Sequence, residues 1–170
     1  MRKETFLAGG VRTAIGSLSG ALAEVSAPAL GGIVVKAALE RAGLSFDQVD
    51  EVIFGNVIGA GCGQNVARQS AIGAGLSVSV GATTVNKVCG SGLKAVMLAD
   101  QAIQCGEVSA IVAGGTENMT RAPYLLEKAR QGYRLGHGEI VDAMIRDGLW
   151  DAYRNIHMGS CGDLCARRFQ

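Results

Sequence analysis

The chain has 170 residues, of which 48% are hydrophobic and 18% are charged, with a formal net charge of +1 at pH 7. This length is enough for a sizeable core, and the hydrophobic content with only two prolines excludes a disordered chain. The 16 basic and 15 acidic residues give no basis for a nucleic-acid or charged-membrane partner.

The N-terminus, "MRKETFLAGGVRT", has no apolar stretch long enough for a signal peptide, and no window reaches the ~18 apolar residues of a membrane span. The cysteine count is odd and too low for a disulfide framework, so free thiols are expected. The cysteines are Cys62, Cys89, Cys105, Cys161 and Cys165. We therefore expect a cytoplasmic protein that does not enter membranes.

In the first half of the chain, "ETFLAGGV" (residues 4–11) predicts a buried strand that ends in glycines. A helix is expected over 30–43, because apolar residues recur there at helical spacing. These residues are Leu30, Ile33, Val34, Ala37 and Ala38. A second strand is expected within 50–61, and a helix that glycine terminates is expected over 65–75.

The β-branched residues of "GATTVNKV" (81–88) predict a third strand. A helix follows from about Cys89 to Gln104. Its expected apolar side comprises Leu93, Val96, Met97 and Ile103. A fourth strand within 108–118 is continuously apolar, so we expect it to be buried on both faces.

This β-α-β-α-β-α-β order predicts an α/β fold with helices on the faces of a mostly parallel or mixed sheet. After about residue 118 the chain is richer in charge, and only "EIVDAMIRDGLW" (139–150) has a clear helical pattern. We therefore predict a first domain over 1–118 and a separate excursion over 119–170.

Cys89 lies between the third strand and the following helix, in "KVCGSGL". A helix N-terminus offers unpaired N–H groups and a positive dipole end, which stabilise a thiolate and an oxyanion. The carboxyl edge of a parallel sheet is also where α/β folds bind ligands. Free cysteines are, however, often buried and inert. The residues alone leave a nucleophile and a packing residue as equal alternatives.

Covalent catalysis by cysteine needs an activating partner, and the chain has only two histidines, His137 and His157. Nothing in their spacing places either near Cys89. His157, Cys161 and Cys165 provide three potential metal ligands without a fourth, so no metal site is expected.

The segment "NKVCGSGLKAVMLADQAI" resembles the active-site cysteine segment of the thiolase family. "FGNVIGAGCGQNVARQSAIGAGL" is similar to the stretch before it, and "VAGGTENMTRAPYLL" to the stretch after it. The resemblance follows the family order along nearly the whole chain. It implies that 1–118 is the thiolase amino-terminal α/β half and that 119–170 begins the inserted loop domain. It also implies that "RAPYLL…GHGEI" belongs to the loop through which such enzymes form homotetramers.

In that family the cysteine matching Cys89 is acylated by acyl-CoA, and its own backbone N–H helps to hold the thioester oxygen. The segment "NIHMG" is similar to the short-chain members, which are acetyl-CoA acetyltransferases that condense two acetyl-CoA to acetoacetyl-CoA or catalyse the reverse thiolysis. There the residues matching Leu149, His157 and Met158 lie along the pantetheine of CoA. The CoA thioesters are substrates, and no cofactor is implied.

The resemblance covers only the first half of a thiolase. The family's Asn-Glu-Ala-Phe, Gly-His-Pro and Cys-x-Gly segments, which carry the activating histidine and the second cysteine, are absent from this sequence. We therefore expect a truncated chain without condensation activity of its own. One alternative is a non-catalytic or split thiolase-like subunit. Another is a relative of the 3-ketoacyl synthases, whose cysteine segment typically reads Ala-Cys-Ser-Ser.

Overall fold

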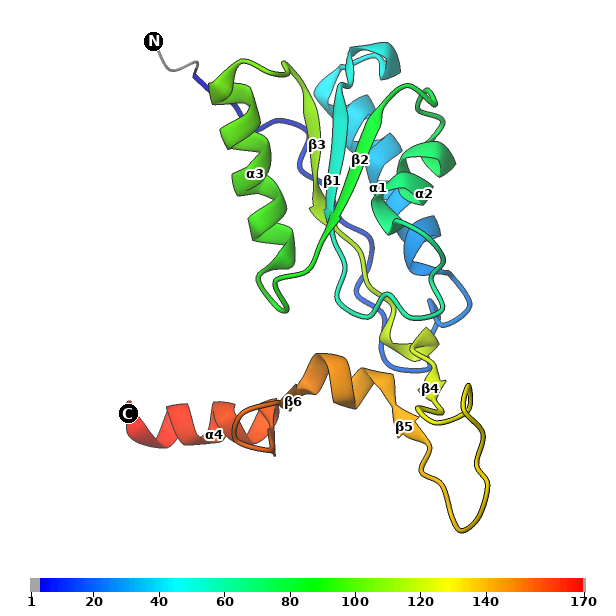
Figure 1. Ribbon diagram of the computed structural model, residues 1–170. Coiled ribbons are helices and arrows are strands. Elements are labelled where there is room, and N and C mark those ends of the chain that lie inside the picture. Colours follow the sequence, from blue (N-terminus) through cyan, green and yellow to red (C-terminus); the bar gives the residue numbers. More distant parts are fainter. Residues whose placement is uncertain (1–3, 170) are drawn as a thin grey trace. The chain divides into compact units, whose positions relative to one another are not determined.

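The computed structural model describes residues 4–169 (Figure 1). The chain forms two compact units that divide between Arg121 and Ala122. The first unit is a sheet with helices on both faces, and the second is built from short elements. The α/β class is thus confirmed, while the assignment of the second unit to a tetramerisation loop stays a prediction.

The sheet of the first unit has three parallel strands in the order β2-β1-β3. These are β1 (Glu51–Gly55), β2 (Gly81–Val85) and β3 (Ile111–Gly115). The central strand β1 is almost completely buried, as its apolar sequence predicts. Because all three strands run in the same direction, their carboxyl ends lie at one edge of the sheet.

Helices α1 (Ala27–Ala42) and α2 (Val66–Ala74) lie on one face of this sheet, and α3 (Ser91–Cys105) lies on the other (Figure 1). A short 3-10 helix, η1 (Phe46–Gln48), precedes β1, and another, η2 (Met119–Arg121), follows β3. The larger core cluster fills the space between the sheet and α1 and α2. It includes Val35, Leu39, Val52, Phe54, Ala67 and Ala71. The smaller cluster consists of Ile53, Ala95 and Ala99 and joins the sheet to α3.

The helix predicted over 30–43 is confirmed as α1, but the side that it buries agrees only in part with the predicted apolar residues. Leu30, Val35 and Leu39 are buried, whereas Ile33 is 57% exposed. The reason is a close contact between α1 and α2, where a Cβ atom on Gly31 would collide with the Ser70 side chain. Glycine adds nothing to an apolar pattern, so the periodicity did not identify the side of α1 that meets α2.

The predicted apolar side of α3 is also wrong in part. Leu93 and Met97 are 68% and 45% exposed, whereas Ala95 and Ala99 are buried against the sheet. Small residues on the buried side let the helix axis lie close to the strands.

The strand predicted over 4–11 is wrong, because this segment has no regular structure. Gly9 has φ +66°, which is outside the β region, and a Cβ atom there would collide with the backbone of α1 at Ala38. A cavity of about 470 Å³ is lined jointly by this segment, β3, α1 and α3. Within the described residues β3 is an edge strand and is half-buried, whereas we expected it to be buried on both faces. The strands of this sheet are parallel, which is one of the two arrangements that the element order predicted.

The second unit contains two small antiparallel strand pairs. Strand β4 (Tyr124–Leu125) pairs with β5 (Val141–Asp142), and β6 (Trp150–Asp151) pairs with β7 (Ile156–His157). A π-helix, η3 (Met144–Leu149), joins the pairs, and α4 (Met158–Arg168) follows the second one. The helix expected over 139–150 is thus only half formed, since its first part is β5. None of the helices in residues 4–169 is long and apolar enough to cross a membrane.

Candidate active site

Cys89 lies in the turn that connects β2 to α3, at the edge of the sheet where the parallel strands end. Its thiol is free and its side chain is exposed. The helix begins two residues later, at Ser91, with Gly90 as its N-cap residue and no side chain capping the N-terminus. The positive end of the α3 dipole is therefore next to the thiol without a competing side-chain acceptor.

Glycines at the strand ends let the first turn of α3 approach the sheet closely. A Cβ atom on Gly55, the last residue of β1, would come within 2.6 Å of Ser91 and 2.7 Å of the Gly92 nitrogen. On Gly115, the last residue of β3, it would come within 2.9 Å of the Gly55 carbonyl oxygen. The N-terminus of α3 thus lies close against the end of β1, which is itself close to the end of β3, and a Cβ atom on Gly92 would be 3.8 Å from the Gly114 carbonyl oxygen of β3.

Val88, the residue before Cys89, has φ +48°. A β-branched residue is a genuine outlier in this region, where backbone sterics cost about 1–3 kcal/mol. Among residues 4–169 the other non-glycine residues with positive φ are Ser19, Asn65 and Asn155, none of which is β-branched. Surrounding contacts must therefore hold Val88, and with it Cys89, in this conformation.

The buried Ser91 provides part of this hold from the C-terminal side of the turn. Its hydroxyl donates to the Val88 carbonyl oxygen at 2.6 Å and accepts from the Lys87 N–H at 2.8 Å. The Ser91 N–H donates to the same Val88 carbonyl at 3.0 Å. These bonds join both sides of Val88 to the first residue of α3.

Asn86 holds the turn from the N-terminal side. Its Oδ1 accepts from the Val88 N–H at 2.9 Å, and its Nδ2 donates to the Val57 carbonyl oxygen at 3.2 Å. One side chain therefore connects the strained residue to the loop that follows β1.

Glu117, which follows β3, in turn fixes this loop. Its carboxylate accepts from the Val57 N–H at 2.8 Å and from the Ile58 N–H at 3.3 Å. It also accepts from the Nδ2 of the buried Asn56 at 3.0 Å. The segments that follow β1, β2 and β3 thus form one hydrogen-bonded network around the Cys89 turn.

Cys62, in the loop after β1, differs from Cys89 because it is partly buried. Burial raises the pKa of the Cys62 thiol, the negative charge of Glu117 raises it further, and Arg121 opposes part of the shift. The Cys62 sulfur also contacts the Ile58 carbonyl oxygen at 3.6 Å as a weak donor. Its environment favours the neutral thiol and not a nucleophile.

The second unit contains Leu149, His157 and Met158, and the β6–β7 pair connects the segments on which they lie. Leu149 ends η3 directly before Trp150, which pairs with His157 across β6 and β7. The Trp150 and His157 rings meet edge to face at 6.4 Å between centroids. The His157 Nδ1 accepts from the Gly159 N–H at 3.0 Å and so caps α4, which begins at Met158. Cys89 belongs to the first unit.

The sequence interpretation missed Asn86, Ser91 and Glu117. The available signal was their type and position, because each is a polar residue within a few positions of a strand end or helix start. Within residues 4–169, no group of three or more His, Cys, Asp or Glu side chains is close enough to hold a metal ion.

Comparison with known proteins gives matches along almost the whole chain. The family model described as "Thiolase, N-terminal domain" matches residues 5–170. The acetyl-CoA acetyltransferase of Pseudomonas aeruginosa is 53% identical over 98% of this chain and 42% of its own length. One of Cupriavidus necator is 56% identical over 93% of this chain and 40% of its own, and one of Escherichia coli is 55% identical over 98% and 43%.

The chain therefore spans about two fifths of the length of these curated relatives. The family match covers both structural units and includes the strand, cysteine turn and helix described above. On these grounds the chain belongs to the thiolase family, whose amino-terminal domain it matches from residue 5 to residue 170.

Proposed function

We propose that this chain supplies the acylated cysteine of an acetyl-CoA C-acetyltransferase, which condenses two acetyl-CoA to acetoacetyl-CoA and CoA or catalyses the reverse thiolysis. The observation that carries the proposal is the exposed Cys89 thiol at the uncapped N-terminus of α3. Relatives named acetyl-CoA acetyltransferase at 53–56% identity support the substrate class.

In the first half-reaction the Cys89 sulfur attacks the carbonyl carbon of acetyl-CoA. A new C–S bond forms, the bond to the CoA sulfur breaks, and the thiol proton is transferred to the departing CoA. Backbone N–H groups in the first turn of α3 are suited to stabilise the oxyanion of the tetrahedral intermediate. One thioester replaces another, so the step is close to balanced in energy and reversible.

In the second half-reaction a base removes a methyl proton from a second acetyl-CoA. The resulting carbanion attacks the acetyl carbonyl, a C–C bond forms, and the Cys89 thiolate leaves. The thiolase segments that carry the activating histidine and the second cysteine do not occur in these 170 residues. We therefore expect the 170-residue chain to accept an acetyl group without forming acetoacetyl-CoA.

The test is intact-mass measurement of the purified chain after incubation with acetyl-CoA. The proposal expects one acetyl adduct that disappears in Cys89→Ser and persists in Cys105→Ser, which removes another exposed thiol. An adduct that persists in Cys89→Ser, or no adduct on a folded wild-type chain, would overturn the assignment. The second result would favour a non-catalytic or split subunit instead.

We further propose that Leu149, His157 and Met158 contact the pantetheine of the bound CoA thioester. Their positions, at the end of η3, on β7 and at the start of α4, support a common ligand. His157→Ala should raise the acetyl-CoA concentration for half-maximal acetylation about tenfold, the usual effect of losing one good contact, with little change in the limiting rate. His137→Ala is the matched control, and an equal effect of both variants would contradict this role.

We also propose homotetramer formation by the full-length enzyme, through the segment that includes β4, β5 and their connecting loop. The loop supports this because its apolar side chains are exposed, notably Leu126, Leu135 and Ile140.

A further inference from the structure

In the turn that carries Cys89, the preceding residue Val88 has a strained backbone conformation. With φ +48°, Val88 is held where its branched side chain is disfavoured. If the turn relaxed to negative φ, the peptide that joins Val88 to Cys89 would rotate. The thiol would then move relative to the N-terminus of α3. The orientation of Cys89 therefore depends on whatever prevents that relaxation.

Two side chains hold the Val88 backbone, and they do so differently. Ser91 is the first residue of α3, so its bonds to Val88 and Lys87 form within the turn itself. Asn86 is the side chain that connects the turn to another part of the fold, through Val57, which is 29 residues earlier in the chain. The Val57 position is itself fixed, because the Glu117 carboxylate binds the Val57 and Ile58 N–H groups from the end of β3.

We propose that Asn86 is a positioning residue for Cys89, which it orients by holding the Val88 N–H against a loop that Glu117 anchors. This inference rests on the proposed function only for its consequence in acetyl transfer. The effect on the thiol itself does not depend on what Cys89 reacts with. The side chain of Asn86 is hydrogen-bonded to Val88 and Val57, so it acts on Cys89 through Val88.

The experiment measures the alkylation rate of Cys89 by iodoacetamide in the full 170-residue chain, with each cysteine quantified by peptide mass. Cys105 is an internal reference, since it is exposed at the opposite end of α3. We expect Asn86→Ala to lower the ratio of the Cys89 alkylation rate to the Cys105 alkylation rate about tenfold. This is the usual effect of losing one intramolecular hydrogen bond. Gln48→Ala is the control. It also removes a side-chain amide that accepts from a backbone N–H, in this case that of Ser45, and it lies before the start of β1, away from the Cys89 turn.

A second pair of variants separates positioning from loss of fold. Glycine adopts positive φ without a steric penalty, so the turn in Val88→Gly no longer needs Asn86 to oppose relaxation. The effect of Asn86→Ala should therefore shrink to about threefold or less in the Val88→Gly background, as a double-mutant cycle would show. Damage transmitted through the loop at Val57 would not be rescued by a change at position 88.

The outcomes keep the two proposals distinct. An unchanged rate ratio in Asn86→Ala, or an equal loss in both backgrounds, overturns the positioning role even if the wild-type chain is acetylated at Cys89. A tenfold loss that Val88→Gly suppresses supports the role even if acetyl-CoA gives no adduct, which would overturn only the proposed function. If both hold, the same variants should slow acetylation and alkylation by similar factors.

Discussion

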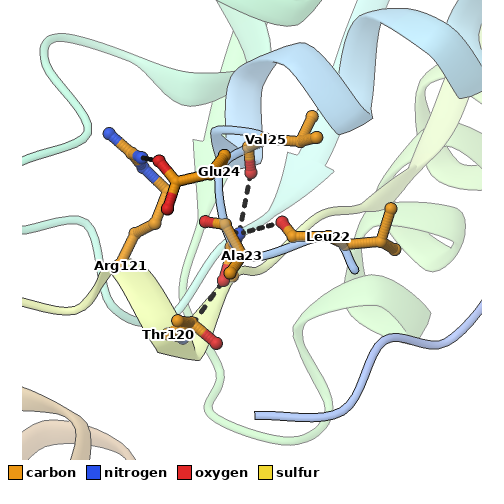
Figure 2. Close-up of polar contacts among 7 residues, drawn as sticks. Leu22, Ala23, Glu24, Val25, Thr120 and Arg121 are labelled. Atoms are coloured by element: carbon orange, nitrogen blue, oxygen red, sulfur yellow. Dashed lines mark hydrogen bonds and ion pairs between the residues drawn. The ribbon is translucent and has the colours of Figure 1, made fainter. Parts of the chain in front are cut away.

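Asn118 shows how one side chain can fix a long irregular segment. Its Nδ2 donates to the carbonyl oxygens of Leu22, Ala23 and Val25, at 3.0, 3.3 and 2.7 Å. Figure 2 shows the Leu22 and Val25 carbonyl oxygens, both in the segment before α1, joined to this nitrogen by dashed lines. We expect Asn118→Ala to lower the free energy of unfolding by about 2 kcal/mol, because several partly buried carbonyls lose their donor together. Urea denaturation followed by circular dichroism measures the change.

The neighbouring ion pair provides the matched control for Asn118. Arg121 and Glu24 join the same two segments, with 3.8 Å between Nη1 and Oε2, but both side chains are largely exposed (Figure 2). Exposed pairs contribute little, so Arg121→Ala should cost less than about 0.5 kcal/mol. Equal losses in the two variants would show that the segment is not held by the Asn118 amide.

Cys62 provides a pH-dependent prediction at the same scale. Burial, followed by the charge of Glu117, raises the pKa of this thiol. Its alkylation by iodoacetamide should therefore begin at higher pH than that of an ordinary free cysteine. Glu117→Gln removes the second cause but leaves burial, so the midpoint should move down without reaching the ordinary value. A rise of the midpoint in this variant would contradict the assigned cause.

The same shift has a defined effect on stability. A thiol whose pKa is raised by folding contributes no pH dependence well below its unfolded pKa, where both states are protonated. As the pH rises above the unfolded pKa, only the unfolded state loses its proton, so stability decreases until the folded pKa is passed. Cys62→Ser should reduce this alkaline loss.

At the scale of elements, the contact between α1 and α2 depends on glycine. A Cβ atom on Gly31 would overlap the Ser70 side chain, whereas one on Gly73, on the exposed side of α2, meets nothing within 4 Å. We expect Gly31→Ala to lower the free energy of unfolding by about 2 kcal/mol, because the added methyl group overpacks the contact. Gly73→Ala should instead raise the free energy of unfolding by about 0.5–1 kcal/mol, because alanine has the higher helix propensity. Thermal unfolding of both variants tests this, and a stabilised Gly31→Ala would show that the helices can separate cheaply.

The position of each main element in the first unit, apart from the first strand, could be predicted because its ends carry local signals. Gly43, Gly75 and Gly106 end α1, α2 and α3 in the left-handed conformation that favours glycine. The buried sides of α1 and α3 could not be predicted, because glycine and alanine make the closest contacts there. The segment over 4–11 has the composition of a strand, but strand formation depends on a hydrogen-bonding neighbour that no local pattern reveals.

At the scale of the molecule, the sequence was sufficient to place Cys89 between a strand and a helix at the edge of a parallel sheet. It was not sufficient for the network around it, because the partners are distant in the chain. Asn86 meets Val57 across 29 residues, and Glu117 meets the same residue across 60. Such pairs follow from strand order and register, which periodicity does not determine.

The loop between β4 and β5 provides the last prediction, because its apolar side chains Leu126, Leu135 and Ile140 are exposed. Leu135 is 99% exposed, and so is Tyr153 between β6 and β7. If the β4–β5 loop is the proposed association surface, Leu135→Ser should raise the dissociation constant of self-association about tenfold. Tyr153→Ser should leave it unchanged. Sedimentation velocity over a range of protein concentrations measures both. If only Tyr153→Ser weakened association, the interface would lie at the β6–β7 pair and not at the β4–β5 loop.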